Sequence, residues 1–359
     1  MLIESACFFQ SMQLQRRSLT ATDRNILPIY SDKPKIKGGH LLGKLFDRII
    51  TVSLNPALDV TLWVNTMDFN EPNKTSAEKV YAGGKAINIA RVFAAYGQKD
   101  VRCLGVAGSD NYKTFTALLD KDGVQYDFVQ IPGAVRENLT LVIPDKRVLK
   151  VNRAGCPVSA RAMHEVKDRI LREIEGQDRC LIVFAGSLPP NITPEAYKAF
   201  ILSLKRENVE IVLDSAVFHV EDMEELRPYL IKPNLPEFRA MCGTDLRTEQ
   251  SIIKFAKVLS ANVTHVLVSL GAKGLLYVGQ GSGARMIPSP VEVRSTIGAG
   301  DTTLASFIYA LEEGRAPAAA AHFAAAAGTA SVTLDGTDIV SKKLVEEMLP
   351  SIMVKNVKV

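Results

Sequence analysis

The chain lacks paired cysteines, long apolar runs and a large net charge. Its five cysteines are scattered, odd in number and without a C-x-x-C motif, which argues against a disulfide framework or a zinc site. They indicate a reducing compartment, so we expect a cytoplasmic location. The sequence contains no run of about 18 strongly apolar residues, which is the length needed to span a membrane. A net charge of +4 on 359 residues gives no reason to expect nucleic-acid or membrane partners.

Two sequence patterns are also missing. There is no G-x-x-x-x-G-K-[ST] phosphate loop, so the chain is not a P-loop enzyme. There is no internal repeat. The hydrophobic fraction of 47% and charged fraction of 23% are those of an ordinary globular protein, and the length allows one large domain or two smaller ones.

The two ends of the chain differ from its middle. Residues 1–48 show no clear periodicity, and we interpret them as a disordered extension. A start codon assigned too far upstream and an organelle presequence remain alternatives. We expect one folded domain over 49–345 and a C-terminal tail over 346–359.

Between these ends, apolar strand patterns alternate with amphipathic helix patterns. The predicted strands are 49–54, 101–106, 181–184, 211–214, 230–232 and 266–270. The predicted helices are 86–96, 115–122, 160–175, 194–208, 235–242, 249–259 and 302–314, and the alanine-rich stretch 316–327 is expected to pack closely on a sheet. This order predicts an α/β fold with a doubly wound, mostly parallel sheet.

Two segments depart from that alternation. Residues 58–82 and 134–153 carry β-type residues at alternate positions and no helix signal. They predict a small separate β-sheet that forms a lid. A sheet of two or three strands cannot bury both faces by itself, so we expect one face to cover a ligand and the other to form a homodimer. The residues expected at that contact or its core are Val60, Leu62, Val64, Leu139, Leu141 and Ile143.

The segment Ser295–Asp301, with sequence S-T-I-G-A-G-D, comes directly before a predicted helix. The amides of Gly298, Ala299 and Gly300 would lie at the positive end of the helix dipole, where anions bind. A carboxylate there would repel a bound phosphate, so its presence needs a chemical reason. Asp301 can remove the proton of a hydroxyl that attacks a phosphoryl group held by these amides.

Polar and glycine residues follow six successive strands. Because the carboxyl ends of parallel strands meet at one edge of a sheet, these residues should form a single site. They are Asp59, Gly83–Asn88, Gly186–Pro190, Asp214, Lys232–Glu237 and Ser269–Gly274.

These motifs, in this order, resemble the PfkB family of carbohydrate kinases, which has a ribokinase-like fold. The signatures are A-G-G-K-A-I-N-I-A-R at 82–91 and the 295–301 segment. The similarity extends from about residue 49 to 344 and is greatest to the branch of 1-phosphofructokinase and tagatose-6-phosphate kinase.

The resemblance implies a role for each motif residue. Asp301 is the expected base and Gly298–Gly300 the expected anion hole. The implied acceptor-site residues are Asp59, Gly83, Gly84, Lys85, Asn88, Arg136, Asn138 and Ser187. The implied nucleotide-site residues are Lys232, Asn234, Glu237, Ser269, Gly271, Gly274 and Thr329, with Glu237 also expected to organise Mg²⁺.

The implied activity is ATP- and Mg²⁺-dependent phosphorylation of a ketohexose phosphate. The cations Lys85 and Arg136 favour a phosphorylated acceptor over a neutral nucleoside. We expect fructose 1-phosphate to be converted to fructose 1,6-bisphosphate. Tagatose 6-phosphate or fructose 6-phosphate, phosphorylated at the 1-hydroxyl, remains an alternative, because Ala86 and Arg153 depart from the family pattern beside the acceptor site. A non-catalytic sugar-phosphate sensor is disfavoured by the intact Asp301 motif.

Overall fold

The computed structural model describes residues 44–143, 147–279, 281–336 and 338–358, and the backbone of two short strands, β1 (Ile36–Lys37) and β2 (His40–Leu41). The chain divides into two units, 1–42 and 43–359. In the first, β1 pairs antiparallel with β2. Apart from these two strands, residues 1–43 of the predicted extension at 1–48 lie outside the described residues. Residues 44–48 belong to the second unit, where the Phe46 side chain is buried.

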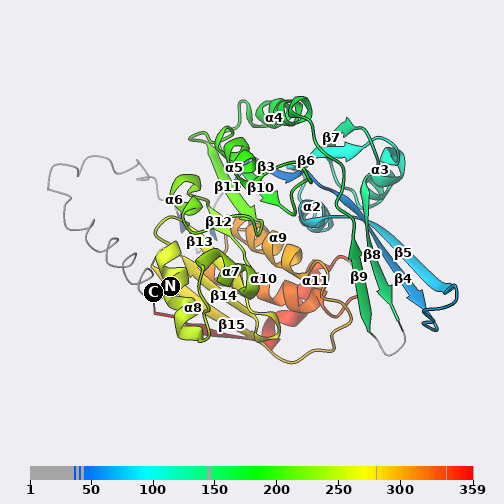
Figure 1. The fold of residues 1–359 in the computed structure, drawn as a ribbon. Helices are drawn as coiled ribbons and strands as arrows, with labels where there is room; N and C mark the ends of the chain where they lie inside the picture. Colours follow the sequence, from blue (N-terminus) through cyan, green and yellow to red (C-terminus); the bar gives the residue numbers. More distant parts are fainter. Residues whose placement is uncertain are drawn as a thin grey trace. The chain divides into compact units, whose positions relative to one another are not determined.

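A sheet of ten strands forms the centre of the second unit (Figure 1). Its strands, in spatial order, are β16 (Ile352–Asn356), β15 (Ser282–Pro288), β14 (Leu275–Gly279), β13 (His265–Ser269), β12 (Leu230–Ile231), β11 (Val209–Asp214), β10 (Cys180–Ala185), β3 (Arg48–Ser53), β6 (Val101–Gly108) and β7 (Tyr126–Ile131). Pairing is parallel from β12–β13 to β6–β7 and antiparallel from β13 to β16. The predicted mostly parallel sheet is confirmed.

Side chains alternate between the two faces of this sheet and build two cores. Ile182 and Phe184 of β10 point into one core, while Leu181 and Val183 point into the other. Strands buried on both faces appear in a sequence as continuous apolar runs, which is why the central strands were predictable.

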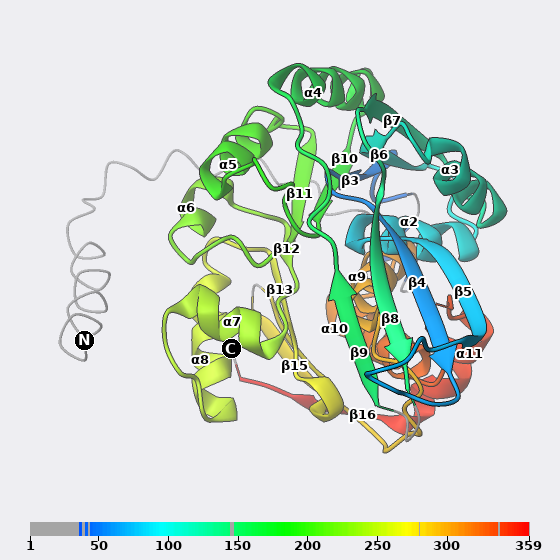
Figure 2. The same cartoon turned by 45° about the vertical axis from the view of Figure 1, so that its right-hand side comes forward.

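Helices cover both faces (Figures 1 and 2). One face packs against α4 (Ala160–Ile174), α5 (Pro194–Leu202), α6 (Asp222–Leu226), α7 (Leu235–Cys242) and α8 (Glu249–Leu259). The other packs against α2 (Lys85–Ala95), α9 (Ala299–Glu312), α10 (Pro317–Ser331) and α11 (Lys342–Met348). The helix α3 (Tyr112–Lys121) packs in a third, smaller core. Among the described residues, no helix is long and apolar enough to cross a membrane.

The second sheet, which we name the lid sheet, contains β5 (Thr75–Gly83), β4 (Ala57–Val64), β8 (Arg136–Val142) and β9 (Val148–Asn152) in that order. Figure 1 shows these strands extending together away from the central sheet. The predicted separate sheet is confirmed, with four strands where two or three were expected. Residues 144–146, inside the predicted segment 134–153, lie outside the described residues.

The structure differs from the sequence prediction at several boundaries. Helix α5 ends at Leu202 although the pattern predicted 194–208, and β7, β14 and β15 were not predicted. The segment set aside as a C-terminal tail contains β16, which pairs with β15 through Met286 and Val354. Ile352 of this strand is 5% exposed and packs in the core, so the tail is part of the domain.

Candidate active site

A cleft of about 930 Å³ lies at the carboxyl ends of the central strands, between the lid sheet and the N-terminus of α9. Strand order reverses beside β3, since β10 lies on one side and β6 on the other. This is the position at which doubly wound sheets bind ligands. Every predicted site residue except Gly83 lines the cleft.

The N-terminus of α9 opens into this cleft. Gly298 is the N-cap, with φ of 75°, and no side chain caps the helix. The helix begins at Ala299, three residues earlier than predicted, and places Asp301 in its first turn. Its first amides therefore have no side-chain acceptor and can bind an anion.

The Asp301 carboxylate is 7% exposed and accepts a hydrogen bond of 2.8 Å from Asn88 Nδ2. Burial is the main cause that raises the pKa of Asp301 to about 6, and the negative charge of Asp214 adds to it. The Asn88 hydrogen bond opposes this rise. A carboxylate with a pKa near neutrality is a better proton acceptor than an ordinary aspartate, while it remains ionised at pH 7.

A cluster of opposite charges lies beside Asp301. Lys85 Nζ is 3.1 Å from Asp214 Oδ1 and 3.5 Å from Glu237 Oε1, and Lys232 Nζ is 3.4 Å from Asp214 Oδ2. Burial alone would raise the pKa of Asp214, but the charges of Lys232 and Lys85 hold it below its ordinary value. Burial likewise opposes the charge of Lys85, whose pKa is nevertheless raised by the neighbouring carboxylates.

This placement differs from the expectation for Lys85. We expected Lys85 to join Arg136 in binding the acceptor phosphate, and in the structure its ammonium lies among the carboxylates of Asp214 and Glu237. A Cβ at Gly300 would lie only 3.1 Å from Lys232 Nζ, so the second ammonium lies directly at the start of α9. Two ammonium groups therefore flank the anion-binding end of the helix.

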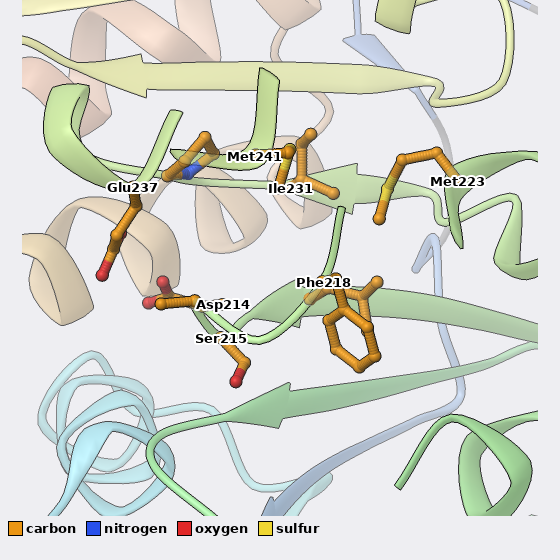
Figure 3. Close-up of a pocket in the computed structure, with 10 residues that line it drawn as sticks. Asp214, Ser215, Phe218, Met223, Ile231, Glu237 and Met241 are labelled. Atoms are coloured by element: carbon orange, nitrogen blue, oxygen red, sulfur yellow. The ribbon is translucent and has the colours of Figure 1, made fainter. Parts of the chain in front are cut away.

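A small cavity of about 10 Å³ lies behind Asp214 and Glu237 (Figure 3). Figure 3 shows these two carboxylates pointing to the same side, with Phe218 and Met223 at the opposite end of the cavity. This space hardly accommodates one water molecule and is lined mainly by apolar side chains. It serves as packing behind the charged cluster.

The inner face of the lid sheet presents polar residues in register. Asp59 of β4 is paired with Asn138 of β8, and Asn138 with Asn152 of β9. Asn138 Nδ2 donates a hydrogen bond of 2.8 Å to Asp59 Oδ1. A Cβ at Gly83 would lie 2.1 Å from Asp59 Oδ2, which explains the glycine: it leaves room for this carboxylate and does not itself line the cleft.

Arg136 joins the lid sheet to the central sheet. Its Nη2 donates to Ser187 Oγ at 3.2 Å and its Nη1 to the Arg153 carbonyl at 2.7 Å. Asn55 Nδ2 donates to Ser187 Oγ and to the carbonyls of Ala154 and Leu188. Burial lowers the pKa of Arg136 from its ordinary value, and the guanidinium remains a cation in the lining of the cleft.

On the other side of the cleft, Asn234 and Glu237 form a capping box at the start of α7. Asn234 Oδ1 accepts from the Glu237 amide, and Glu237 Oε2 accepts from the Asn234 amide, both at 2.9 Å. Gly274 has φ of 92°, and a Cβ there would lie 2.2 Å from the Met286 carbonyl. The glycine is thus required by close backbone packing. Ser269, Gly271 and Thr329 line the same part of the cleft.

Sequence reasoning assigned no role to several residues that the fold brings to this site. Asp214 was recognised as a strand end only, because its two lysine partners are distant in sequence. Asn55 was not singled out. Lys150 lines the cleft from β9, opposite Thr140 in register. The alternation of β9, applied from Asn152 backwards, would have placed Lys150 on the inner face.

Comparison with known proteins agrees with this geometry. A model described as pfkB family carbohydrate kinase matches residues 53–344. The chain belongs to this family. It is a phosphotransferase of the PfkB type, and membership implies the use of ATP.

Its relatives include curated bacterial enzymes. The chain is 30% identical over 308 residues to the 1-phosphofructokinase of Vibrio cholerae, covering 86% of this chain and 96% of that protein. It is 31% identical over 265 residues to the 1-phosphofructokinase of Escherichia coli, covering 74% and 84%. The fold is similar to that of phosphofructokinase-2 from Escherichia coli in complex with fructose-6-phosphate, with a TM-score of 0.77 and 23% identity over 84% of this chain and 98% of that one.

The position of Asp301 leads to a test of the PfkB kinase reaction. Asp301→Asn preserves the shape of the side chain but cannot accept a proton, so we expect kcat to fall by about 10²–10⁴ with little change in KM. In the wild type, kcat/KM should fall as the pH decreases through about 6, because protonation removes the base.

A coupled assay of ADP release between pH 5 and 8 measures both effects. Asp127→Asn is the control, since Asp127 pairs with Arg169 outside the cleft. Full activity of Asp301→Asn would show that another group accepts the proton.

Proposed function

We propose that this protein transfers the γ-phosphoryl group of ATP to the 6-hydroxyl of fructose 1-phosphate and forms fructose 1,6-bisphosphate. The observation that carries the proposal is the cleft itself, which places a buried base at a helix N-terminus opposite a lid sheet that presents a cation and a row of polar side chains. The similarity to curated 1-phosphofructokinases supports the choice of acceptor.

The lid side of the cleft provides the acceptor subsite. Asp59, with the amides of Asn138 and Asn152 in the same row, suits the hydroxyl groups of a sugar. Burial raises the pKa of Asp59, while the hydrogen bond from Asn138 opposes this rise. Arg136 and Ser187 lie at the end of this row and suit the phosphate of the acceptor, because a guanidinium binds phosphate through two parallel N–H groups.

The opposite side provides the donor subsite. In the proposed complex, the amides of Ala299 and Gly300, with the Lys232 ammonium, hold the transferred phosphoryl group and its developing charge. Asp301 takes the proton of the attacking hydroxyl as the new O–P bond forms; the bond between the γ-phosphorus and the β–γ bridging oxygen of ATP breaks, and ADP leaves. Lys85 lies among the same charged groups and stabilises the transferring phosphoryl group, which replaces our earlier expectation that it binds the acceptor phosphate. Ser269, Gly271, Gly274 and Thr329 line the space for the nucleotide.

The same charges support a role for Mg²⁺. Asp214, Glu237 and Asp301 outnumber the ammonium groups of Lys85 and Lys232, so nucleotide phosphates entering here need further positive charge. Among the described residues, no three His, Cys, Asp or Glu side chains form a metal cage. A single carboxylate with water and phosphate oxygens is the coordination that Mg²⁺ prefers. We infer that Glu237 holds Mg²⁺ in this way; when bound, the ion neutralises phosphate charge.

A screen of acceptors tests the proposed function. Fructose 1-phosphate, fructose 6-phosphate, tagatose 6-phosphate and free fructose are incubated separately with the full chain, ATP and Mg²⁺, and the product is read by ³¹P NMR. We expect the highest kcat/KM with fructose 1-phosphate. Preference for a 6-phosphate would reassign the acceptor to the tagatose 6-phosphate or fructose 6-phosphate alternative. Absence of turnover with every acceptor would favour the sensor hypothesis.

Arg136 gives a sharper test of the acceptor subsite. Arg136→Ala removes a charge-assisted contact worth about 1.5–3 kcal/mol, so KM for the sugar phosphate should rise about 10- to 100-fold while KM for ATP changes little. Arg247→Ala is the control, because Arg247 is an exposed arginine paired with Asp245 away from the cleft. An equal rise in both KM values would place Arg136 outside the acceptor subsite.

We also propose that the outer face of the lid sheet forms a homodimer. On this face Leu62, Leu141 and Leu149 lie in one row across three strands, and Val60, Leu139 and Val151 lie in the next. Val60 and Val64 are buried within the subunit, whereas Leu149 is 50% and Val151 49% exposed. The exposed part of the apolar face thus lies on β9, and an isologous contact would cover it.

Light scattering at micromolar concentration measures the oligomeric state. We expect a dimer for the wild type and a monomer for the double variant Leu149→Asp, Val151→Asp, since two carboxylates cannot be buried unpaired. Phe69→Asp is the matched control, because Phe69 is 89% exposed and lies outside β4 and β5. A fully active wild-type monomer would limit the lid sheet to covering the acceptor. If the double variant is still a dimer by light scattering, the interface lies elsewhere.

A cytoplasmic location stays a prediction from the cysteine pattern.

A further inference from the structure

The α2 helix carries an arginine, Arg91, that is only 2% exposed and lies one helical turn after Asn88. Its Nε donates to Asp122 Oδ2 at 2.5 Å, and its guanidinium lies over the ring of Tyr81 in β5, 5.0 Å from the ring centroid. The Tyr81 hydroxyl donates to Asp338. A buried guanidinium with an anion at one end and an aromatic face beside it is held in a fixed orientation.

A further hydrogen bond of Arg91 links it, through Asn88, to Asp301. Arg91 Nη1 donates to Asn88 Oδ1 at 3.5 Å, one helical turn earlier, and Asn88 Nδ2 donates to Asp301 Oδ2 at 2.8 Å. A guanidinium can only donate hydrogen bonds, so the amide of Asn88 must turn its oxygen towards Arg91. Its nitrogen is then directed at Asp301. The reversed amide would place two acceptor oxygens against each other.

We propose that Arg91 is a positioning residue that fixes the orientation of the Asn88 amide and thereby keeps Asp301 ionised and correctly aimed. The inference deepens the proposed function and rests on it, since it concerns the same base. Arg91 does not line the cleft and is not expected to touch either substrate.

Other groups also act on Asp301, and the test must separate them from Arg91. Asn88 and Lys85 face it from α2, Asp214 from the end of β11, and Lys232 from the segment before α7. The lysines and Asp214 act by charge alone, over the distances that separate them. The Asn88 amide acts through a directed hydrogen bond, and its effect depends on which end faces the carboxylate.

The variant Arg91→Lys keeps the charge and removes the planar group. Released from Arg91, the Asn88 amide no longer donates reliably, so the ionised base loses a stabilising partner. We expect the pH at which kcat/KM falls to half its maximum on the acidic side to increase by about half a pH unit or more, with KM for ATP unchanged. Substrate phosphates also titrate near pH 6, so each variant is compared with the wild type in the same buffers.

Asp122→Asn provides a second variant that is better tolerated, because the Asp122 side chain is 24% exposed. Loss of this anchor loosens Arg91 and should also increase the pH of half-maximal kcat/KM. Electrostatics alone predicts the opposite direction, since removal of a negative charge lowers the pKa of a nearby carboxyl group. The sign of this shift therefore distinguishes positioning from charge.

A double-mutant cycle completes the test. In an Asn88→Ala background, Arg91→Lys should produce no further shift of this pH. An equal shift in both backgrounds, or no shift in either, overturns the inference. Arg169→Lys is the matched control, since Arg169 is a partly buried arginine paired with Asp127 and Glu165 outside the cleft, and its pH profile should coincide with that of the wild type.

Failure of this inference differs from failure of the proposed function. If the wild type phosphorylates a ketohexose phosphate and Asp301→Asn does not, the function stands whatever Arg91 does. If Asp301→Asn is fully active, the base assignment fails and the inference about Arg91 fails with it. Thermal unfolding of each variant confirms that a changed pH profile belongs to a folded enzyme.

Discussion

The site depends on one buried carboxylate, Asp214, held between two ammonium groups. An isolated charge at this depth would cost several kcal/mol in lost hydration, so Asp214, Lys85 and Lys232 are tolerable only together. Asp214 lies at the end of β11, Lys85 in α2 and Lys232 in the segment before α7, and these elements are far apart in sequence. The ion pairs therefore fix the place where these elements meet, and the same charges determine how Asp301 ionises.

This arrangement also explains why Asp301, the proposed base, has a raised pKa. A carboxylate in the first turn of α9 benefits from the helix dipole, which favours its ionised form. Burial and the negative charge of Asp214 act against ionisation, and the balance leaves the pKa of Asp301 at about 6. The group is ionised at neutral pH and still basic enough to accept a proton. A more exposed aspartate would be ionised but would be a weaker base.

Most of the fold could be predicted from the sequence, because central strands are continuous apolar runs and the motifs follow strand ends. The prediction missed β7 and the antiparallel strands β14 to β16, and of these β16 joins its neighbour β15 only after the helices α9 to α11. All the predicted site residues except Gly83 line the cleft, but the sequence could not assign their partners. It grouped Lys85 with Arg136 by role, and it gave no sign that the Lys85 ammonium lies 3.1 Å from Asp214 Oδ1. A flexible lysine reaches several neighbours, and only the three-dimensional position of opposite charges decides among them.

The lid sheet shows how one small element can serve two purposes. Its alternating pattern directs Asp59, Asn138 and Asn152 to the cleft and directs Leu139 and Val151 to the other face. A shift of one residue in register would exchange the two sets, so recognition of the acceptor and burial of the apolar face both require the same register. If a second subunit covers the outer face, as we propose, its binding also holds the inner polar row in place. Assembly and acceptor binding would then stabilise the same strand pairing, and each would favour the other.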